Sequence, residues 1–256
     1  ISDLTGIEDF ISLTRLYCHS NQLTSLDLSL NTILNRVYCH SNQLTSLDLS
    51  SNTILQTLYC YSNQLTSLDV SSNTALQTLY CSSNQLSTLD VSSNIALEYL
   101  NCKLNQLSIL DVGANTNLTY LNFSSNQIST IDVNSNTALQ GLTCSLNQFL
   151  TLDISSNIAL VYLNCSSNEL TSLNIKNGNN LNLTLYTINN PQLFCIEVDN
   201  AIDANSGTGN YSSWEKDYAA SYNENCSLDD DNDTVSNYLD QCPNTPNGIV
   251  VDVNGC

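Results

Sequence analysis

Alternating acidic residues near the C-terminal end carry the most specific chemistry in the chain. Asp229, Asp231 and Asp233 are spaced two residues apart, and two further oxygen-bearing side chains follow within seven residues. Alternate carboxylates in a tight loop present hard oxygen atoms to Ca²⁺, which takes about six to eight of them. The candidate calcium ligands are Asp229, Asp231, Asp233, Val235 through its carbonyl, Asn237, and Asp240 as a bidentate ligand.

The same segment resembles the thrombospondin type 3 calcium repeat, whose pattern is D-x-D-x-D-G-x-x-D-x-x-D-x-C. The resemblance runs from Asp229 to Cys242 and implies one calcium-binding loop rather than a long array. Thr234 replaces the Gly that eases the sharp turn, and Asn237 replaces an Asp. Both departures lower the expected affinity. Without calcium, we expect charge repulsion to disorder the tail.

A second acidic series recurs at a fixed interval along the chain. Paired carboxylates can hydrolyse glycosides, but a catalytic pair occurs once in a protein, whereas a residue repeated seven times is scaffold. We expect each of these carboxylates to accept hydrogen bonds from turn N–H groups, with cation binding along the series as an alternative. The series is Asp27, Asp48, Asp69, Asp90, Asp111, Asp132 and Asp153.

No constellation in the sequence supports catalysis. The chain has two His residues, no nucleophile accompanied by a base and an orienting acid, no Gly-rich phosphate loop and no zinc pattern. We therefore expect a protein that is not an enzyme.

Eleven cysteines divide into two groups. Seven occupy one position of the repeat, which Phe123 fills in the sixth block, so we interpret them as small apolar core residues. Oxidation or binding of a soft metal is the alternative, but ligands on one flat strand column cannot surround a tetrahedral ion. The seven are Cys18, Cys39, Cys60, Cys81, Cys102, Cys144 and Cys165.

The other four cysteines, Cys195, Cys226, Cys242 and Cys256, follow the regular blocks. An even number in an acidic, loop-rich segment indicates disulfides. Of the three possible pairings we favour the sequential one, which joins Cys195 to Cys226 and Cys242 to Cys256. Disulfides favour an oxidising location outside the cytoplasm.

The element that must position these residues is a repeat. The letters YCHSNQLTSLDLS stand at Tyr17–Ser29 and return unchanged at Tyr38–Ser50. Leu16 and Cys18 alternate with exposed residues at the period of two that a strand requires. One block cannot bury enough apolar surface to fold alone, so the blocks must stack. They begin at Leu13, Leu34, Leu55, Leu76, Leu97, Leu118, Leu139, Leu160 and Leu181.

The block pattern L-x-x-L-x-C-x-x-N-x-L-x-x-L-D-L-x-x-N-x-x resembles the leucine-rich repeat over about residues 1–200. That resemblance implies a leucine-rich repeat solenoid of the α/β-class horseshoe type. A block of about 21 residues has no room for a full helix, so we expect mostly parallel β-sheet plus turns. The segment ISDLTGIEDFISL resembles the start of the repeats in internalin-like surface proteins, and the whole arrangement resembles secreted or surface proteins of Bacteroidetes-type bacteria.

We divide the chain into an N-terminal cap (1–12), the solenoid (13–194), a C-terminal cap (195–228) and the calcium segment (229–256). The pattern slips by about one residue after Leu181, so Leu183, Leu185 and Thr187 are expected to point inward in a ninth rung. Trp214 and Tyr218 are candidates to cover the open end of the core.

The exposed side of the strands is the candidate ligand platform, because tyrosine gives rigid contact area with a polar tip. The alternative is that tyrosine has a high strand propensity and packs on the next rung. His19 and His40 could share a metal, but no third ligand follows in their column, so solvated His is favoured. The candidate residues on this concave sheet face are Tyr17, Tyr38, Tyr59, Tyr80, Tyr61, Tyr99, Tyr120, Tyr162, His19 and His40.

Composition limits the partners. A net charge of -19, from 5 basic and 24 acidic residues, repels nucleic acid and anionic lipid surfaces. The chain has no apolar stretch long enough to span a membrane. It starts at Ile1 without an initiator Met or signal peptide, which suggests a mature or trimmed chain.

We therefore expect a monomeric, secreted or cell-surface adhesion module that binds a protein or a glycan. One alternative is a structural spacer, stiffened by calcium, that links to an anchoring domain absent from the sequence. Another is ice binding, because the hydroxyl array that starts at Thr24, Thr45 and Thr66 resembles antifreeze surfaces before it gives way to Ser and then Leu150.

Overall fold

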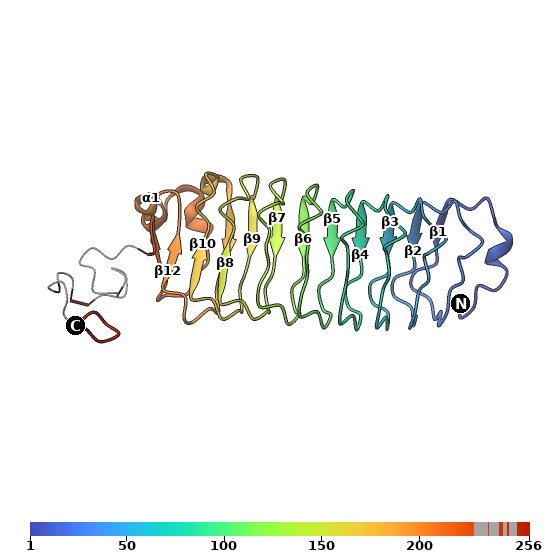
Figure 1. The fold of residues 1–256 in the computed structure, drawn as a ribbon, viewed down its shortest axis with the longest axis horizontal. Helices are drawn as coiled ribbons and strands as arrows, with labels where there is room; N and C mark the ends of the chain where they lie inside the picture. The colour runs from blue at the N-terminus through green and yellow to red at the C-terminus, as the bar shows by residue number, and fades with distance from the viewer. Residues whose placement is uncertain (228–234, 236–240, 243–244, 246–249) are drawn as a thin grey trace.

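The chain winds into an elongated stack of coils that lie side by side along the long axis (Figure 1). This computed structural model describes residues 1–227, 235, 241–242, 245 and 250–256. Each coil, called a rung below, contributes one short strand to a parallel sheet. The repeat thus fixes the direction of the stack, because every rung hydrogen-bonds to the rungs before and after it.

Among the described residues, nine strands form the main sheet, in the order β1-β2-β3-β4-β5-β6-β7-β9-β11. These strands are β1 (Arg15–Tyr17), β2 (Arg36–Tyr38), β3 (Thr57–Tyr59), β4 (Thr78–Tyr80), β5 (Tyr99–Asn101), β6 (Tyr120–Asn122), β7 (Gly141–Thr143), β9 (Tyr162–Asn164) and β11 (Thr184–Tyr186).

The central residue of each of these strands points into the core, and its two neighbours point outward. Leu58 and Leu79, for example, are partners in adjacent strands and are both fully buried. Leu16 pairs with Val37, one regular block later, whereas Leu163 pairs with Leu185, one position further on than a regular block would reach. The slip predicted after Leu181 is therefore confirmed, and with it the ninth rung. Leu183, Leu185 and Thr187 are all buried.

A left-handed residue ends the extended part of each rung. Ser62 has a φ of 54° and Leu104 a φ of 55°, and the equivalent position in every rung from Ser20 to Asn189 is also positive. The Asn that follows satisfies the backbone at this bend. Asn63 Nδ2 donates to the Cys39 and Cys60 carbonyls, and its Oδ1 accepts from the Leu44 amide. The same bonds recur from rung to rung and form an asparagine ladder.

A second asparagine ladder lies elsewhere in the rung and was not predicted. Asn52 is fully buried, and its Nδ2 donates to the carbonyls of Leu28 and Asn31 in the preceding rung at 3.2 and 3.0 Å. Asn73 repeats the arrangement one rung later with Leu49 and Asn52. The two ladders together tie adjacent rungs at two points around the coil.

The cysteine column is buried, as the sequence predicted. Cys39, Cys60 and Cys81 are fully buried and free, and Phe123 occupies the same position in its rung with no exposed surface. Phe123 packs against Phe149 with ring centroids 6.0 Å apart. Burial raises the pKa of these thiols, to about 12 for Cys81. These thiols pack as small apolar side chains in the core and are not reactive groups.

A second parallel sheet forms on another side of the C-terminal rungs, which the sequence did not predict. Its order is β13-β12-β10-β8. The strands are β8 (Thr151–Asp153), β10 (Ser172–Asn174), β12 (Cys195–Glu197) and β13 (Ser221–Asn223). The earlier rungs cross this side as turns and extended chain, as expected. A 3₁₀ turn, η2 (Asn180–Asn182), lies between β10 and β11.

Short helical segments close the two ends of the stack. At the N-terminal end is η1 (Ile7–Asp9), with Leu4 and Ile7 packed against the core. At the other end are α1 (Ala201–Ser206) and η3 (Gly209–Ser213). None of the helices in the described part of the chain is long and apolar enough to cross a membrane.

Trp214 covers the last rung, as predicted, but Tyr218 does not. Trp214 Nε1 donates to the Leu183 carbonyl at 2.7 Å, and its ring packs edge-on against Tyr211 and Tyr222. Tyr218 is fully exposed. It lies in a turn before β13, and Tyr211 and Tyr222 take the covering role instead. The cap is fastened by the predicted Cys195–Cys226 disulfide.

Candidate ligand-binding face

The outward side chains of the main sheet form three columns, which together are called the strand face. One column holds the first residue of each strand, one holds the third, and one holds the residue two positions later. Strand pairing places each residue beside its equivalent in the next rung, at the sheet spacing of about 4.8 Å. Side chains that are a whole block apart in the sequence therefore touch.

Tyrosine rings stack along the column of third strand residues. Tyr17 and Tyr38 are nearly parallel, with centroids 4.7 Å apart and an interplanar angle of 10°. Tyr59 and Tyr80 repeat this geometry at 4.6 Å and 11°, and Tyr38 meets Tyr59 edge-on at 4.8 Å. These contacts are the cross-strand packing that was the alternative explanation of the tyrosines. Both roles are compatible, because Tyr17 stays exposed and Tyr38, Tyr59 and Tyr80 are only half-buried.

A second aromatic row runs beside the first. His19 and His40 stack at 4.5 Å, and His40 stacks on Tyr61 at 4.2 Å. Tyr59 and Tyr61 join the two rows, with centroids 6.3 Å apart. The continuous surface made by Tyr17, Tyr38, Tyr59, Tyr80, His19, His40 and Tyr61 is called the aromatic patch.

Partial burial shifts the titration of the patch. The pKa of His40 is lowered mainly by burial, and the neighbouring His19 lowers it further. Burial raises the pKa of Tyr59 and Tyr80. The Nδ1 atoms of His19 and His40 lie 3.2 and 3.3 Å from the hydroxyls of Ser20 and Ser41. Among the residues that the structure describes, no three His, Cys, Asp or Glu side chains gather as a metal site would require.

The remaining predicted tyrosines form a separate, looser group. Tyr99 and Tyr162 are exposed, whereas Tyr120 lies over Gly141, where an added Cβ would come within 3.1 Å of its ring. Tyr162 contacts Tyr186, with centroids 5.8 Å apart. Tyr186 also lies on this face and was not predicted there. Allowing for the slip in the last rung places it in the tyrosine column.

The charge of the strand face differs from that of the whole chain. Its three columns contain Arg15, Arg36, Lys103 and both histidines, and they contain no Asp or Glu from β1 to β11. Three of the chain's five basic residues are therefore here, although acidic residues outnumber basic ones by 24 to 5.

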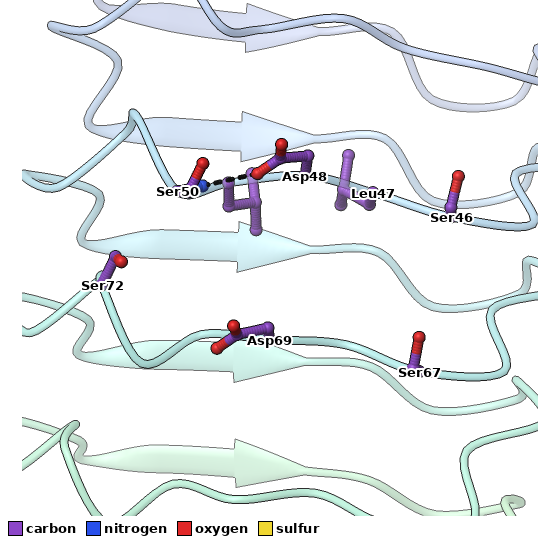
Figure 2. A pocket seen from close by; sticks show the side chains of 8 residues that line it. Ser46, Leu47, Asp48, Ser50, Ser67, Asp69 and Ser72 are labelled. Atoms are coloured by element: carbon purple, nitrogen blue, oxygen red, sulfur yellow. Dashed lines mark hydrogen bonds between the residues drawn. The ribbon is translucent and has the colours of Figure 1, made fainter.

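The repeated aspartates lie on the opposite layer, called the Asp face. Figure 2 shows a hollow between two rungs where Asp48, Asp69 and neighbouring serines lie on segments that cross in front of the strands. Asp48 Oδ1 accepts the Ser50 amide at 2.9 Å, which lowers the pKa of Asp48. The predicted hydrogen bonding to turn N–H groups is confirmed. The same bond in the other rungs identifies this column as scaffold.

The candidate calcium ligands fall almost wholly outside the described residues. Asp229, Asp231, Asp233, Asn237 and Asp240 are among those not described, and Val235 alone is. The predicted Cys242–Cys256 disulfide, next to this segment, is formed.

Comparison with known proteins identifies the class of fold. Two family models match the chain: one for leucine-rich repeats in two copies, at residues 55–94, and one for a single leucine-rich repeat, at residues 117–139. A search of curated proteins found no match. With its Leu-filled interior and parallel strands, the chain folds as a leucine-rich repeat solenoid.

Solved structures show the same fold. The functional domain of InlJ from Listeria monocytogenes, which includes a cysteine ladder, is 32% identical, with a TM-score of 0.58 over 77% of this chain and 57% of its own. A leucine-rich repeat protein of Leptospira interrogans is 26% identical, with a TM-score of 0.70 over 85% and 64%. Internalin InlF of Listeria monocytogenes, at 24% and a TM-score of 0.53 over 76% and 64%, shares the fold. The chain spans less than two thirds of each.

Proposed function

We propose that this chain is a non-enzymatic binding module that acts outside the cell and holds a macromolecular ligand on the aromatic patch. The observation that carries the proposal is the continuity of the patch, in which seven aromatic side chains from four rungs touch one another. Leucine-rich repeat solenoids generally offer an extended surface to their ligands. Tyrosine is enriched at the energetic centres of such surfaces.

The disulfides support an extracellular location. Cys195–Cys226 and Cys242–Cys256 both lie after the regular rungs, where the chain has fewer apolar residues to bury. Disulfides persist in oxidising compartments and are rare in the cytosol. The seven core cysteines do not argue against this, because burial protects their thiols from oxidants.

The proposal is tested by capturing partners from extracellular material with the immobilised chain and with the Tyr38→Ala/Tyr59→Ala/Tyr80→Ala variant. We expect the variant to lose the captured partner, because these rings are the centre of the patch. Tyr218→Ala is the matched control, since it removes a fully exposed tyrosine from the cap. It should capture as the unmodified chain does.

Thermal unfolding of each variant separates loss of binding from loss of fold. If the triple variant keeps its fold and still captures the partner, the aromatic patch is not the binding site. If it unfolds, the single change Tyr17→Ala replaces it, because Tyr17 is 57% exposed and contacts one tyrosine only.

A further inference from the structure

An unpaired arginine pair borders the aromatic patch. Arg15 and Arg36 are direct partners in the register of β1 and β2, so their side chains leave the sheet beside each other. Within the described residues, no carboxylate lies within the 4.0 Å of either guanidinium that an ion pair requires. Like charges placed opposite each other in a sheet destabilise it. In a chain with 24 acidic residues, leaving this pair without a counter-charge is a cost that a bound anion would remove.

The histidines line the other side of the tyrosines. In the first two rungs the order across the strand face is Arg15, Tyr17, His19 and, one rung on, Arg36, Tyr38 and His40. Guanidinium groups therefore flank one side of the Tyr17–Tyr38 stack, and imidazole rings, which can donate hydrogen bonds, flank the other. The Asp face lies on the opposite layer. An anionic partner would be repelled by most of the molecule and attracted here.

The ring geometry determines which groups the patch offers. Tyr17 and Tyr38 stack on each other within 10° of parallel, as do His19 and His40 within 9°. Most π faces in these two rows are consequently used within the protein, and among the described residues the outer faces of Tyr17 and His19 remain without an aromatic partner. Uncharged sugars are held mainly by aromatic faces. Exposed hydroxyls and guanidinium forks instead suit carboxylates, which accept hydrogen bonds and bind Arg in a bidentate manner.

The composition of the strand face matches surfaces that bind proteins. Tyr, Asn, Ser, Thr and Arg fill most of the positions in its three columns. Tyrosine and arginine are the residues enriched at protein-binding hot spots, and Ser and Asn add adaptable hydrogen bonding. We infer that the patch, flanked by Arg15 and Arg36, recognises an acidic polypeptide segment whose carboxylates lie across the first two rungs. This inference rests on the proposed function and names the chemistry of its partner.

The test measures binding of poly-L-glutamate to the intact chain at low salt, with hyaluronate and poly-L-glutamine as comparison probes. We expect poly-L-glutamate to bind most tightly, and Arg15→Gln/Arg36→Gln to weaken it by about tenfold or more, because paired charges at an interface are strongly coupled. Added salt should weaken binding to the unmodified chain far more than to the variant.

A single-site comparison controls for net charge. Arg36→Gln and Lys176→Gln remove the same charge, but Lys176 lies in the C-terminal half, where its Nζ donates to the Glu224 carbonyl. Only Arg36→Gln should weaken binding. Equal effects of the two changes, an absence of poly-L-glutamate binding, or hyaluronate binding as tightly would each overturn the inference.

The outcome is separable from that of the proposed function. The arginine variants leave every tyrosine in place, so a captured partner that requires Tyr38, Tyr59 and Tyr80 but tolerates the loss of both arginines would reject only the acidic-segment inference. Failure of the tyrosine variant to lose its partner would reject the proposed site itself.

Discussion

Leu44 and Asn63 are joined across two neighbouring rungs by a hydrogen bond of 3.0 Å from the Leu44 amide to Asn63 Oδ1. The side-chain amide of Asn63 also donates to the carbonyls of Cys39 and Cys60, at 3.1 and 3.0 Å. One buried side chain thus bonds three backbone groups. The two carbonyls also accept from Asn42 and Asn84, whereas the Leu44 amide donates to Asn63 alone.

Asn63→Ala should lower the free energy of unfolding by about 3 kcal/mol, because it leaves the buried Leu44 amide unpaired and removes two further hydrogen bonds to carbonyls. Urea unfolding measures the loss. Asn117→Ala is the control, since Asn117 is exposed and makes one bond, to the Ile95 carbonyl. It should change stability by less than about 0.5 kcal/mol. Equal losses would mean that the ladder position has no special role.

Stability should fall as the pH rises above about 9. Unfolded thiols lose their protons near the ordinary pKa of 9.0, whereas burial raises the pKa in the fold, to about 11 for Cys18 and about 12 for Cys165. The stabilising contribution is therefore complete below pH 9. It is lost at about 1.4 kcal/mol per pH unit per thiol until the folded pKa is reached.

Urea unfolding at pH 8 and pH 10 checks this dependence against the Cys60→Ala/Cys81→Ala/Cys102→Ala variant. Tyrosines titrate in both chains, so the difference between them isolates the removed thiols. The variant should lose less stability over this interval. An identical pH dependence in the two chains would show that the buried thiols do not contribute.

Leu104→Asn should stabilise the chain by about 0.5–1 kcal/mol, because a leucine at φ 55° is strained and Asn tolerates the left-handed region. Leu30→Asn is the control, since both leucines are about half exposed and Leu30 has an ordinary φ. Thermal unfolding should show a gain at position 104 alone. A gain of the same size at position 30 would assign the effect to lost surface apolarity instead.

Trp214→Ala should destabilise the C-terminal rungs by about 3 kcal/mol or more, because it uncovers the last rung and removes the bond to the Leu183 carbonyl. Hydrogen exchange at Leu183 and Leu185 would report the loss locally. Tyr218→Ala, in the same cap, should leave exchange unchanged. Unaltered protection in the Trp214 variant would refute the covering role.

The acidic tail should bind calcium. Isothermal titration of the intact chain with Ca²⁺ should give a heat of binding that the Asp231→Ala/Asp240→Ala variant lacks, because both carboxylates are predicted ligands. Ser46→Ala, far from the tail, is the control. Equal heats from the intact chain and the double variant would dispose of the site.

Periodicity predicted most of the fold, because a rung that must fit its neighbour leaves little freedom. The inward Leu, Cys and Phe123 positions followed from it, as did the longer step into the rung of Leu185. The second sheet could not be predicted in this way. Thr151–Asp153 forms β8, whereas Thr88, Leu89 and Asp90 have the same three residue types and form no strand. Pairing there depends on the distance between rungs, which no single block encodes.

The sequence predicted which residues lie on the strand face, but not how their rings are arranged. Tyr17, Tyr38 and His40 could be placed in columns by counting, but whether their rings would stack or splay depends on packing between rungs. Tyr218 was expected to cover the open end of the core together with Trp214, because the two residues would be about one turn apart in a helix. The chain instead leaves η3 before Trp214, so that spacing carried no information.

Because Tyr17–Ser29 and Tyr38–Ser50 are identical, whole rungs are interchangeable units of length. Excising residues 30–50 would join Ser29 to Ser51 in the original phase, and neither terminal cap would meet an unfamiliar neighbour. The platform can therefore grow or shrink in increments of one strand spacing, about 4.8 Å.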